Sequence, residues 1–207
     1  KLINLMWEAS DAILKVYHSG ELNTELKGDQ SPVTRADLAA HHVLVNRLSQ
    51  LTPNIQVVSE EDPDSLRIPE THQRYWLIDP LDGTKEFINR NDEFTCNLAL
   101  IDSHKTIYGF VSVPVFNHLY HGGDYYGAYQ VDRTGTEIRI QCKRQAVPIR
   151  IVASKSHLNP ETTAFIEAFE TPVELIQAGS SLKFLRVAEG SADLYPRLAS
   201  TCEWDTA

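Results

Sequence analysis

The spacing of apolar residues predicts two amphipathic helices at the start of the chain. Residues 2–18 and 34–51 each repeat apolar side chains at helical intervals. The repeating positions are Leu2, Met6, Ala9, Ile13, Val16 and Tyr17 in the first stretch, and Leu38, Val45, Leu48 and Leu51 in the second. Gly20 is typical of a helix end, and Thr34 followed by Asp37 is typical of a capping box that starts a helix.

Beyond Pro53 the pattern changes from helical spacing to that of β-strands. Short apolar runs separated by Gly, Asn and Asp predict five strands and a shorter sixth one. These runs are residues 55–59, 75–78, 94–101, 107–115 and 125–131, with the short one at 118–121. The polar residues 63–71 are typical of a surface loop.

After Pro148 strands and helices alternate, which is typical of a layered α/β unit. The predicted order is a strand at 149–153, a helix at 160–169, a strand at 173–177, a helix at 181–189 and a strand at 192–195. The change of pattern near residues 143–148 predicts two parts, an α+β part over 1–147 and an α/β part over 148–207.

Charge and composition exclude several classes of protein. The 207 residues include 19 Lys and Arg against 28 Asp and Glu, a net charge of −9, which argues against a nucleic-acid partner. No apolar run approaches the ~20 residues of a transmembrane helix. Cys96, Cys142 and Cys202 form no Cys-x-x-Cys pair, so we expect a reducing, cytoplasmic location. Peripheral association with the cytoplasmic side of the inner membrane, and the oligomeric state, remain open.

The most informative segment is Asp79-Pro80-Leu81-Asp82-Gly83-Thr84, which directly follows an apolar strand. Two carboxylates and the Leu81 carbonyl could supply three oxygen ligands to Mg²⁺, which prefers such donors. The Gly83 and Thr84 amides could open a helix N-terminus that binds an anion. Asp, Pro and Gly also form ordinary turns, and the spacing alone leaves both interpretations open.

Two more acidic positions could join the same site. Residues 59–62, Ser-Glu-Glu-Asp, also end a predicted strand, so their carboxylates could converge with those of residues 79–84 on one cation. A solvated acidic loop is the ordinary interpretation of such a run. Trp204-Asp205 offers another carboxylate beside an aromatic ring, although an Asp at this position is also a common helix cap.

In this order the motifs resemble the inositol monophosphatase superfamily of Mg²⁺-dependent, lithium-sensitive phosphatases. Its Asp-Pro-(Ile/Leu)-Asp-Gly-Thr core matches residues 79–84, and its later Trp-Asp matches Trp204-Asp205. Its upstream Glu-Glu matches Glu60-Glu61, and its Thr-x-x-Asp element matches residues 34–37. The resemblance covers essentially the whole chain and implies a mixed α and β fold, a layered αβαβα sandwich.

Flanking residues narrow the resemblance to the bacterial 3'(2'),5'-bisphosphate nucleotidases of sulfate assimilation. Lys85-Glu86-Phe87 stands where inositol phosphatases typically have Thr-Asn-Phe. The segments that resemble these nucleotidases are residues 59–63, 75–79, 179–184, 188–190 and 194–197. The resemblance implies hydrolysis of adenosine 3',5'-bisphosphate to AMP and phosphate. A phosphatase of inositol or sugar phosphates and a non-catalytic metal- or nucleotide-binding module are the alternatives. Family members continue past the Trp-Asp, so we expect C-terminal material to be missing here.

The resemblance also implies roles for individual residues. The metal ligands, for two or three Mg²⁺ ions, are Glu60, Asp79, Asp82, Asp205 and the carbonyl of Leu81. Thr84, hydrogen-bonded to Asp37, orients and deprotonates a water, whereas pure helix capping is the alternative for Thr34 and Asp37. The substrate contacts are Glu60, Leu81, Asp82, Gly83, Thr84, His157, Ser180, Lys183, Arg197 and Asp205. A surface lysine and a structural histidine are the plain alternatives for Lys183 and His157.

Overall fold

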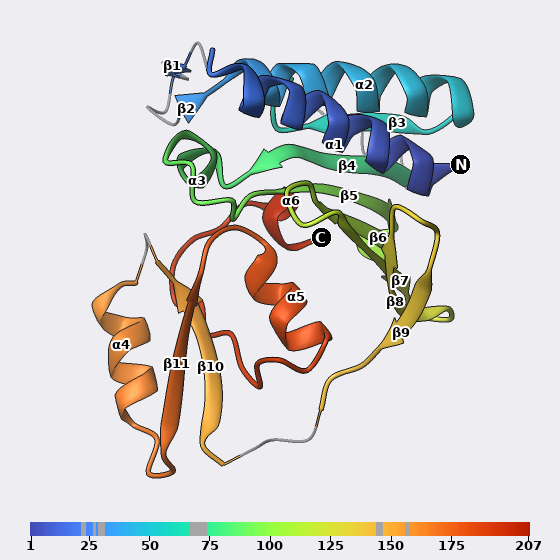
Figure 1. The fold of residues 1–207 in the computed structure, drawn as a ribbon. Coiled ribbons are helices and arrows are strands. Elements are labelled where there is room, and N and C mark those ends of the chain that lie inside the picture. Colours follow the sequence, from blue (N-terminus) through green and yellow to red (C-terminus); the bar gives the residue numbers. More distant parts are fainter. Residues whose placement is uncertain (22–23, 27, 29–31, 67–73, 144–146, 156–157) are drawn as a thin grey trace.

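Two long helices form the first layer of the fold (Figure 1). In the computed structural model, which describes residues 1–21, 24–26, 28, 32–66, 74–143, 147–155 and 158–207, these are α1 (Leu2–Ser19) and α2 (Arg35–Leu51). Gly20 ends α1 with a φ of 78°, and a capping box of Thr34 and Asp37 begins α2. Both predicted helices and their ends are confirmed.

A seven-stranded sheet forms the second layer. Its spatial order is β3 (Gln56–Ser59), β4 (Arg74–Asp82), β5 (Thr95–Asp102), β6 (Lys105–Val113), β7 (His118–Gly123), β8 (Gly127–Asp132) and β9 (Glu137–Ile140). β3 and β4 are parallel, and every other neighbouring pair is antiparallel. The faces of α1 and α2 join this sheet in one buried apolar cluster that includes Leu5, Ile13, Leu44, Leu48, Ile78, Leu98 and Phe110. Two smaller elements complete this region, the pair β1 (Glu25–Leu26) with β2 (Pro32–Val33) and the helix α3 (Thr84–Ile88).

The remaining layers come from residues 148–207, which we call the C-terminal segment. β10 (Ile149–Ser154) and β11 (Val173–Ala178) form a parallel pair, α4 (Pro160–Glu167) lies beyond it, and α5 (Leu182–Ala188) lies between this pair and the large sheet (Figure 1). Leu182 and Leu185 of α5 pack on Val113 and Tyr120 of the large sheet. A short helix, α6 (Glu203–Thr206), ends the chain. The order of layers is αβαβα, so the expected mixed fold is confirmed.

The structure differs from the sequence pattern in several strands, of which the unpredicted pair β1 and β2 is the first. β4 continues through Asp82 rather than ending at residue 78, because its antiparallel pairing with β5 persists beyond the apolar run. β9 was not predicted, and it forms by pairing with β8 although three of its four residues are exposed. The strand expected at 192–195 is wrong, since only Leu194 makes an isolated bridge, to Ile151. Part of the expected loop at 63–71 lies outside the described residues.

Within the described residues, none of the helices combines the length and the apolar character needed to cross a bilayer. The longest, α1, has 18 residues but carries polar and charged side chains on one side, such as Glu8 and Lys15. Its apolar positions face the sheet instead. The apolar residues of α1 therefore pack inside the fold along the helix.

Candidate active site

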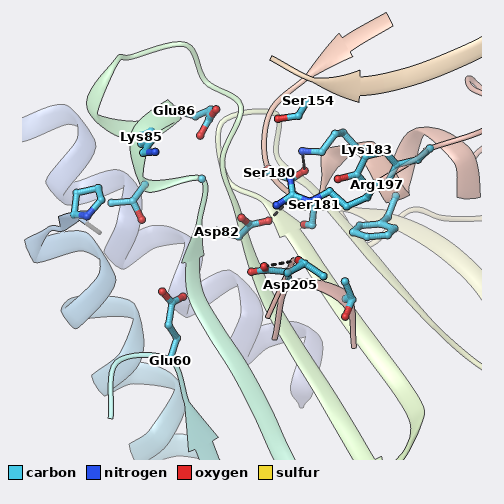
Figure 2. A pocket seen from close by; sticks show the side chains of 17 residues that line it. Glu60, Asp82, Lys85, Glu86, Ser154, Ser180, Ser181, Lys183, Arg197 and Asp205 are labelled. Atoms are coloured by element: carbon cyan, nitrogen blue, oxygen red, sulfur yellow. Dashed lines mark hydrogen bonds between the residues drawn. The ribbon is translucent and has the colours of Figure 1, made fainter. Parts of the chain in front are cut away.

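A cavity of about 390 Å³ lies between the end of β4 and the C-terminal segment (Figure 2). Its lining is Pro32, Glu60, Asp82, Gly83, Thr84, Lys85, Glu86, Ser154, Ser180, Ser181, Lys183, Phe184, Tyr195, Arg197, Thr201, Asp205 and Thr206. Figure 2 shows Asp82 facing Asp205, with Lys183 and Arg197 on the same side as Ser180. The cavity therefore has an acidic wall and a cationic wall, which we describe in turn.

Strand pairing brings the carboxylates of the acidic wall together. β3 and β4 are parallel, so their carboxyl ends meet at one edge of the sheet. Glu60 directly follows β3, and its amide donates to the carbonyl of Ile78 at 3.2 Å. Asp79 and Asp82 end β4, where the register with β5 shifts between them and Pro80 has no N–H to donate. Carboxylate oxygens of Asp79, Asp82 and Asp205 all lie within 4.8 Å of one another.

Two carboxylates of this wall, Asp79 and Asp82, disfavour their own ionisation. Burial, followed by the charge of Glu60, raises the pKa of Asp79 well above its usual value. Burial and the charge of Asp205 raise the pKa of Asp82 to about 6, although Lys183 and the Ser181 amide oppose that shift. A cluster with this excess of negative charge and only oxygen donors fits a hard cation such as Mg²⁺.

Asp205 reaches the cluster from the far end of the chain because α6 is anchored beside it. Trp204 packs on Val58, Tyr75, Leu77, Ala99 and Ile101, which form the apolar patch on the sheet face opposite α1 and α2. The Asp205 carboxylate accepts hydrogen bonds from the Thr201 hydroxyl at 2.8 Å and from the Cys202 amide at 3.1 Å. Asp205 therefore caps a helix and lies in the cluster, so the two interpretations of this motif are compatible.

Asp37 combines two contacts on separate oxygens. Its Oδ2 accepts hydrogen bonds from the Thr34 amide at 2.7 Å and from the Thr34 hydroxyl at 2.6 Å, which is the capping role. Its Oδ1 accepts from the Thr84 hydroxyl at 3.2 Å, and that hydroxyl lies equally close to the Leu81 carbonyl. Asp37 is only 1% exposed, so the α2 cap fixes the orientation of a carboxylate whose other oxygen faces Thr84.

The cationic wall consists of Lys183 and Arg197. Lys183 is 6% exposed, donates to the Ser180 carbonyl and lies 5.5 Å from the centre of the Tyr195 ring. Burial lowers the pKa of Lys183, against the opposing effect of Asp82 and Glu86. Arg197 donates to the Ser200 carbonyl at 3.1 Å, whereas its Nε is buried and has no partner among the described residues. A buried donor without a partner is costly, which makes this wall suited to an anion.

Ser181 joins the two walls through contacts that the sequence analysis missed. Its amide donates to Asp82 Oδ2 at 2.5 Å, and its hydroxyl contacts Thr95 at 2.7 Å and Asn97 at 2.9 Å. Thr95 and Asn97 are buried on β5, whose register pairs them with Asp82 and Asp79. Two polar residues at alternate positions in an otherwise apolar strand were the available signal in the sequence.

The structure brings together every described residue of the predicted site. Asp37, Asp79 and Leu81 lie buried beneath the cavity, and the other described members line it directly. His157 lies outside the described residues. The pocket-lining Lys85 and Glu86, the latter buried, were not predicted as site residues.

Known proteins resemble this chain in sequence and in structure. The sequence profile of the inositol monophosphatase family matches residues 1–207. The 3'(2'),5'-bisphosphate nucleotidase CysQ of Escherichia coli O157:H7 is 46% identical over 208 residues, covering all of this chain and 83% of that protein. The CysQ of Buchnera aphidicola is 37% identical to this chain, and the match covers all of this chain and 77% of that protein. The crystal structure of CysQ from Bacteroides thetaiotaomicron, a bacterial member of the inositol monophosphatase family, superimposes with a TM-score of 0.83 at 37% identity, covering 99% of this chain and 80% of that one. A chain with this motif order, fold and degree of identity belongs to the inositol monophosphatase family.

Proposed function

We propose that the protein is a Mg²⁺-dependent 3'(2'),5'-bisphosphate nucleotidase that hydrolyses the 3'-phosphate of adenosine 3',5'-bisphosphate to AMP and phosphate. The observation that carries the proposal is the two-walled cavity, which offers carboxylates for cations and, apart from them, the buried Lys183 and the partly buried Arg197 for a second anionic group. The names of relatives that are 46% and 37% identical over the whole chain support this substrate class.

The acidic wall suits the cofactor expected of the family. Glu60, Asp79, Asp82, Asp205 and the Leu81 carbonyl would hold two or three Mg²⁺ ions. When bound, Mg²⁺ neutralises phosphate charge and lowers the pKa of water. The spacing of the three aspartates within 4.8 Å and the raised pKa of Asp82 both reflect a crowding of negative charge that bound cations would relieve.

Thr84 and Asp37 are the pair that would accept the proton of the attacking water. The Thr84 hydroxyl keeps its own proton toward Asp37 Oδ1, so an oxygen lone pair is left to accept a hydrogen bond from water in the cavity. The water oxygen then forms a bond to phosphorus while the bond from phosphorus to the 3' oxygen breaks. The Thr84 oxygen takes up the water proton as its own proton passes to Asp37 Oδ1, and the 3' oxygen keeps the electron pair and takes up a proton from solvent.

The remaining residues would place the nucleotide. The amides of Gly83 and Thr84 open α3 beside the acidic wall and would hold oxygens of the 3'-phosphate. Lys183 and Arg197 would bind the 5'-phosphate, because a buried phosphate needs a cationic partner. Ser180 lines the same side and would contact the nucleotide, as would His157.

The test is phosphate release from adenosine 3',5'-bisphosphate, measured in parallel with inositol 1-phosphate. We expect turnover of the nucleotide only, and loss of that turnover when EDTA removes Mg²⁺. Equal turnover of inositol 1-phosphate would favour the sugar phosphatase, and release of no phosphate from either would favour a binding module. Inhibition by Li⁺, with Na⁺ as the ionic-strength control, is the accompanying expectation from the family's lithium sensitivity.

A further inference from the structure

The loop between α3 and β5 is held rigidly against α1. Arg90 and Asp92 adopt positive φ values of 56° and 67°, which are uncommon for residues other than glycine. The Tyr17 hydroxyl donates to Asp92 Oδ1 at 2.7 Å, and the Arg90 guanidinium donates to the Tyr17 carbonyl and lies 4.6 Å over its ring. The first layer of the fold therefore fixes the position of the next residue, Glu93.

Glu93 reaches from this loop to the C-terminal segment. Its Oε1 lies 2.8 Å from Lys155 Nζ, and its Oε2 accepts from the Gly179 amide at 2.9 Å. Ser154 and Ala178 are the last register pair of β10 and β11, so Lys155 and Gly179 are the first residues beyond that pair. A single carboxylate on the N-terminal side thus holds the carboxyl ends of both parallel strands.

The close approach of the chain at Gly179 leaves no room for a side chain there. A Cβ at Gly179 would lie 2.6 Å from Glu86 Cγ and 3.0 Å from the Glu93 carbonyl oxygen, so this position requires glycine. Two residues further on, the Ser181 amide meets Asp82 Oδ2 at 2.5 Å. α5 starts immediately after that contact and carries Lys183.

We propose that Glu93 is a positioning residue for substrate binding: its carboxylate fixes the loop 179–181 on the acidic wall and thereby sets the distance between the carboxylate cluster and Lys183. Glu93 does not line the cavity, so it acts through the loop rather than on the substrate. Its pairing with Lys155 also offsets the charge of that lysine. The substrate in this inference rests on the proposed function.

The test compares the variants Glu93→Ala and Glu93→Gln with the wild type. We expect Glu93→Ala to raise the KM for adenosine 3',5'-bisphosphate about tenfold, with a much smaller change in kcat, because a charge-assisted contact that places a binding group is lost. Glu93→Gln keeps an acceptor for the Gly179 amide, so its KM should lie between those of Glu93→Ala and the wild type. Hydrogen exchange of peptides covering residues 179–182 should accelerate in the order wild type, Gln, Ala.

Asp11→Asn is the matched control. Asp11 pairs with Arg133 across the surface at 2.6 Å and links α1 to the turn after β8, away from the cavity. Unchanged exchange at 179–182 in Glu93→Ala, a fall in kcat at constant KM, or the same KM change in Asp11→Asn would each overturn the positioning role. If the wild type releases no phosphate from the nucleotide, the proposed function fails, whereas the exchange measurement still decides whether Glu93 holds the loop.

Discussion

The two walls of the cavity are built from different kinds of structure. Glu60, Asp79 and Asp82 stand at the ends of paired strands in a seven-stranded sheet, so the sheet places each of them. Lys183 stands on a helix of seven residues, and Arg197 follows it in irregular chain. The sheet places three carboxylates of the acidic wall and α6 brings Asp205, whereas the position of the cationic wall depends on the contacts of Ser181 with Asp82 and of Gly179 with Glu93.

Burial acts on the two walls in opposite directions. It is the first cause of the raised pKa of Asp79 and Asp82 and also of the lowered pKa of Lys183, so burial disfavours the charged form of each of these three groups. The charges of Asp82 and Lys183 attract each other, but this attraction offsets the effect of burial on their pKa values only in part. Cations on one wall and phosphate on the other would relieve both, which explains why charges of opposite sign face each other across one cavity rather than forming closed ion pairs.

The strongest way to break the acidic wall is to replace one of its carboxylates. We expect Asp79→Asn and Asp82→Asn each to lower kcat/KM about a thousandfold or more, because the cation site loses a charged ligand. Thermal unfolding of the metal-free protein should be unchanged or shifted upward, since the repulsion between like charges falls. Asp102→Asn, at an exposed ion pair with Arg74, is the control for loss of one carboxylate. Near-normal activity in either site variant would show that the ligand assignment is wrong.

Removing the Thr84 hydroxyl should separate proton handling from metal binding. We expect Thr84→Val to lower kcat about a hundredfold with little change in KM, because no hydroxyl remains between water and Asp37. Thr84→Ser should recover most of the activity. Steady-state kinetics at saturating Mg²⁺ gives kcat and KM for both variants. A Thr84→Val enzyme as fast as the Thr84→Ser enzyme would contradict the role.

The pH dependence of stability sharpens the contrast between the walls. The pKa of Asp82 rises on folding from 3.8 to about 6, so between these values the folded protein retains a proton that the unfolded chain has released. The free energy of unfolding of the metal-free protein should therefore fall as pH rises through this window, by roughly 2–3 kcal/mol from this group. Denaturant titrations of the wild type and of Asp82→Asn, from pH 4 to pH 6, isolate the contribution as their difference. If the free energy of unfolding changed with pH equally in the two proteins, the assigned contribution of Asp82 would be wrong.

The smallest expected effect concerns the cationic wall. Lys183→Met should raise the KM for adenosine 3',5'-bisphosphate about tenfold, as loss of one charged contact implies. Inositol 1-phosphate, which has no second phosphate, should be affected much less if it is hydrolysed at all. Arg186→Met is the control, because Arg186 lies on the same helix and pairs with Glu189 instead of lining this cavity. An equal loss on both substrates would place Lys183 at the scissile phosphate.

Local features of the fold could be predicted from sequence. The ends of α1 and α2 depend on Gly20 and on the Thr34 capping box, and each involves residues within one helical turn. β9 and the end of β4 could not be predicted, because both depend on pairing with another strand rather than on their own apolar content. The missing strand at 192–195 has the same cause, since its apolar residues find only one bridge partner.

The candidate site divides in the same way. The sequence points to Asp79, Asp82, Thr84 and Asp205 through the resemblance of its motifs to the family, since the spacing of residues 79–84 alone leaves an ordinary turn open. Only the tertiary structure decides that Ser181 meets Asp82 and that Glu93 holds Gly179, contacts that span 99 and 86 residues of the chain. Side chains so far apart become neighbours only when strands pair and layers pack. The order of the sequence motifs therefore indicated the chemistry, whereas the distance between the two charged walls is a property of the folded chain.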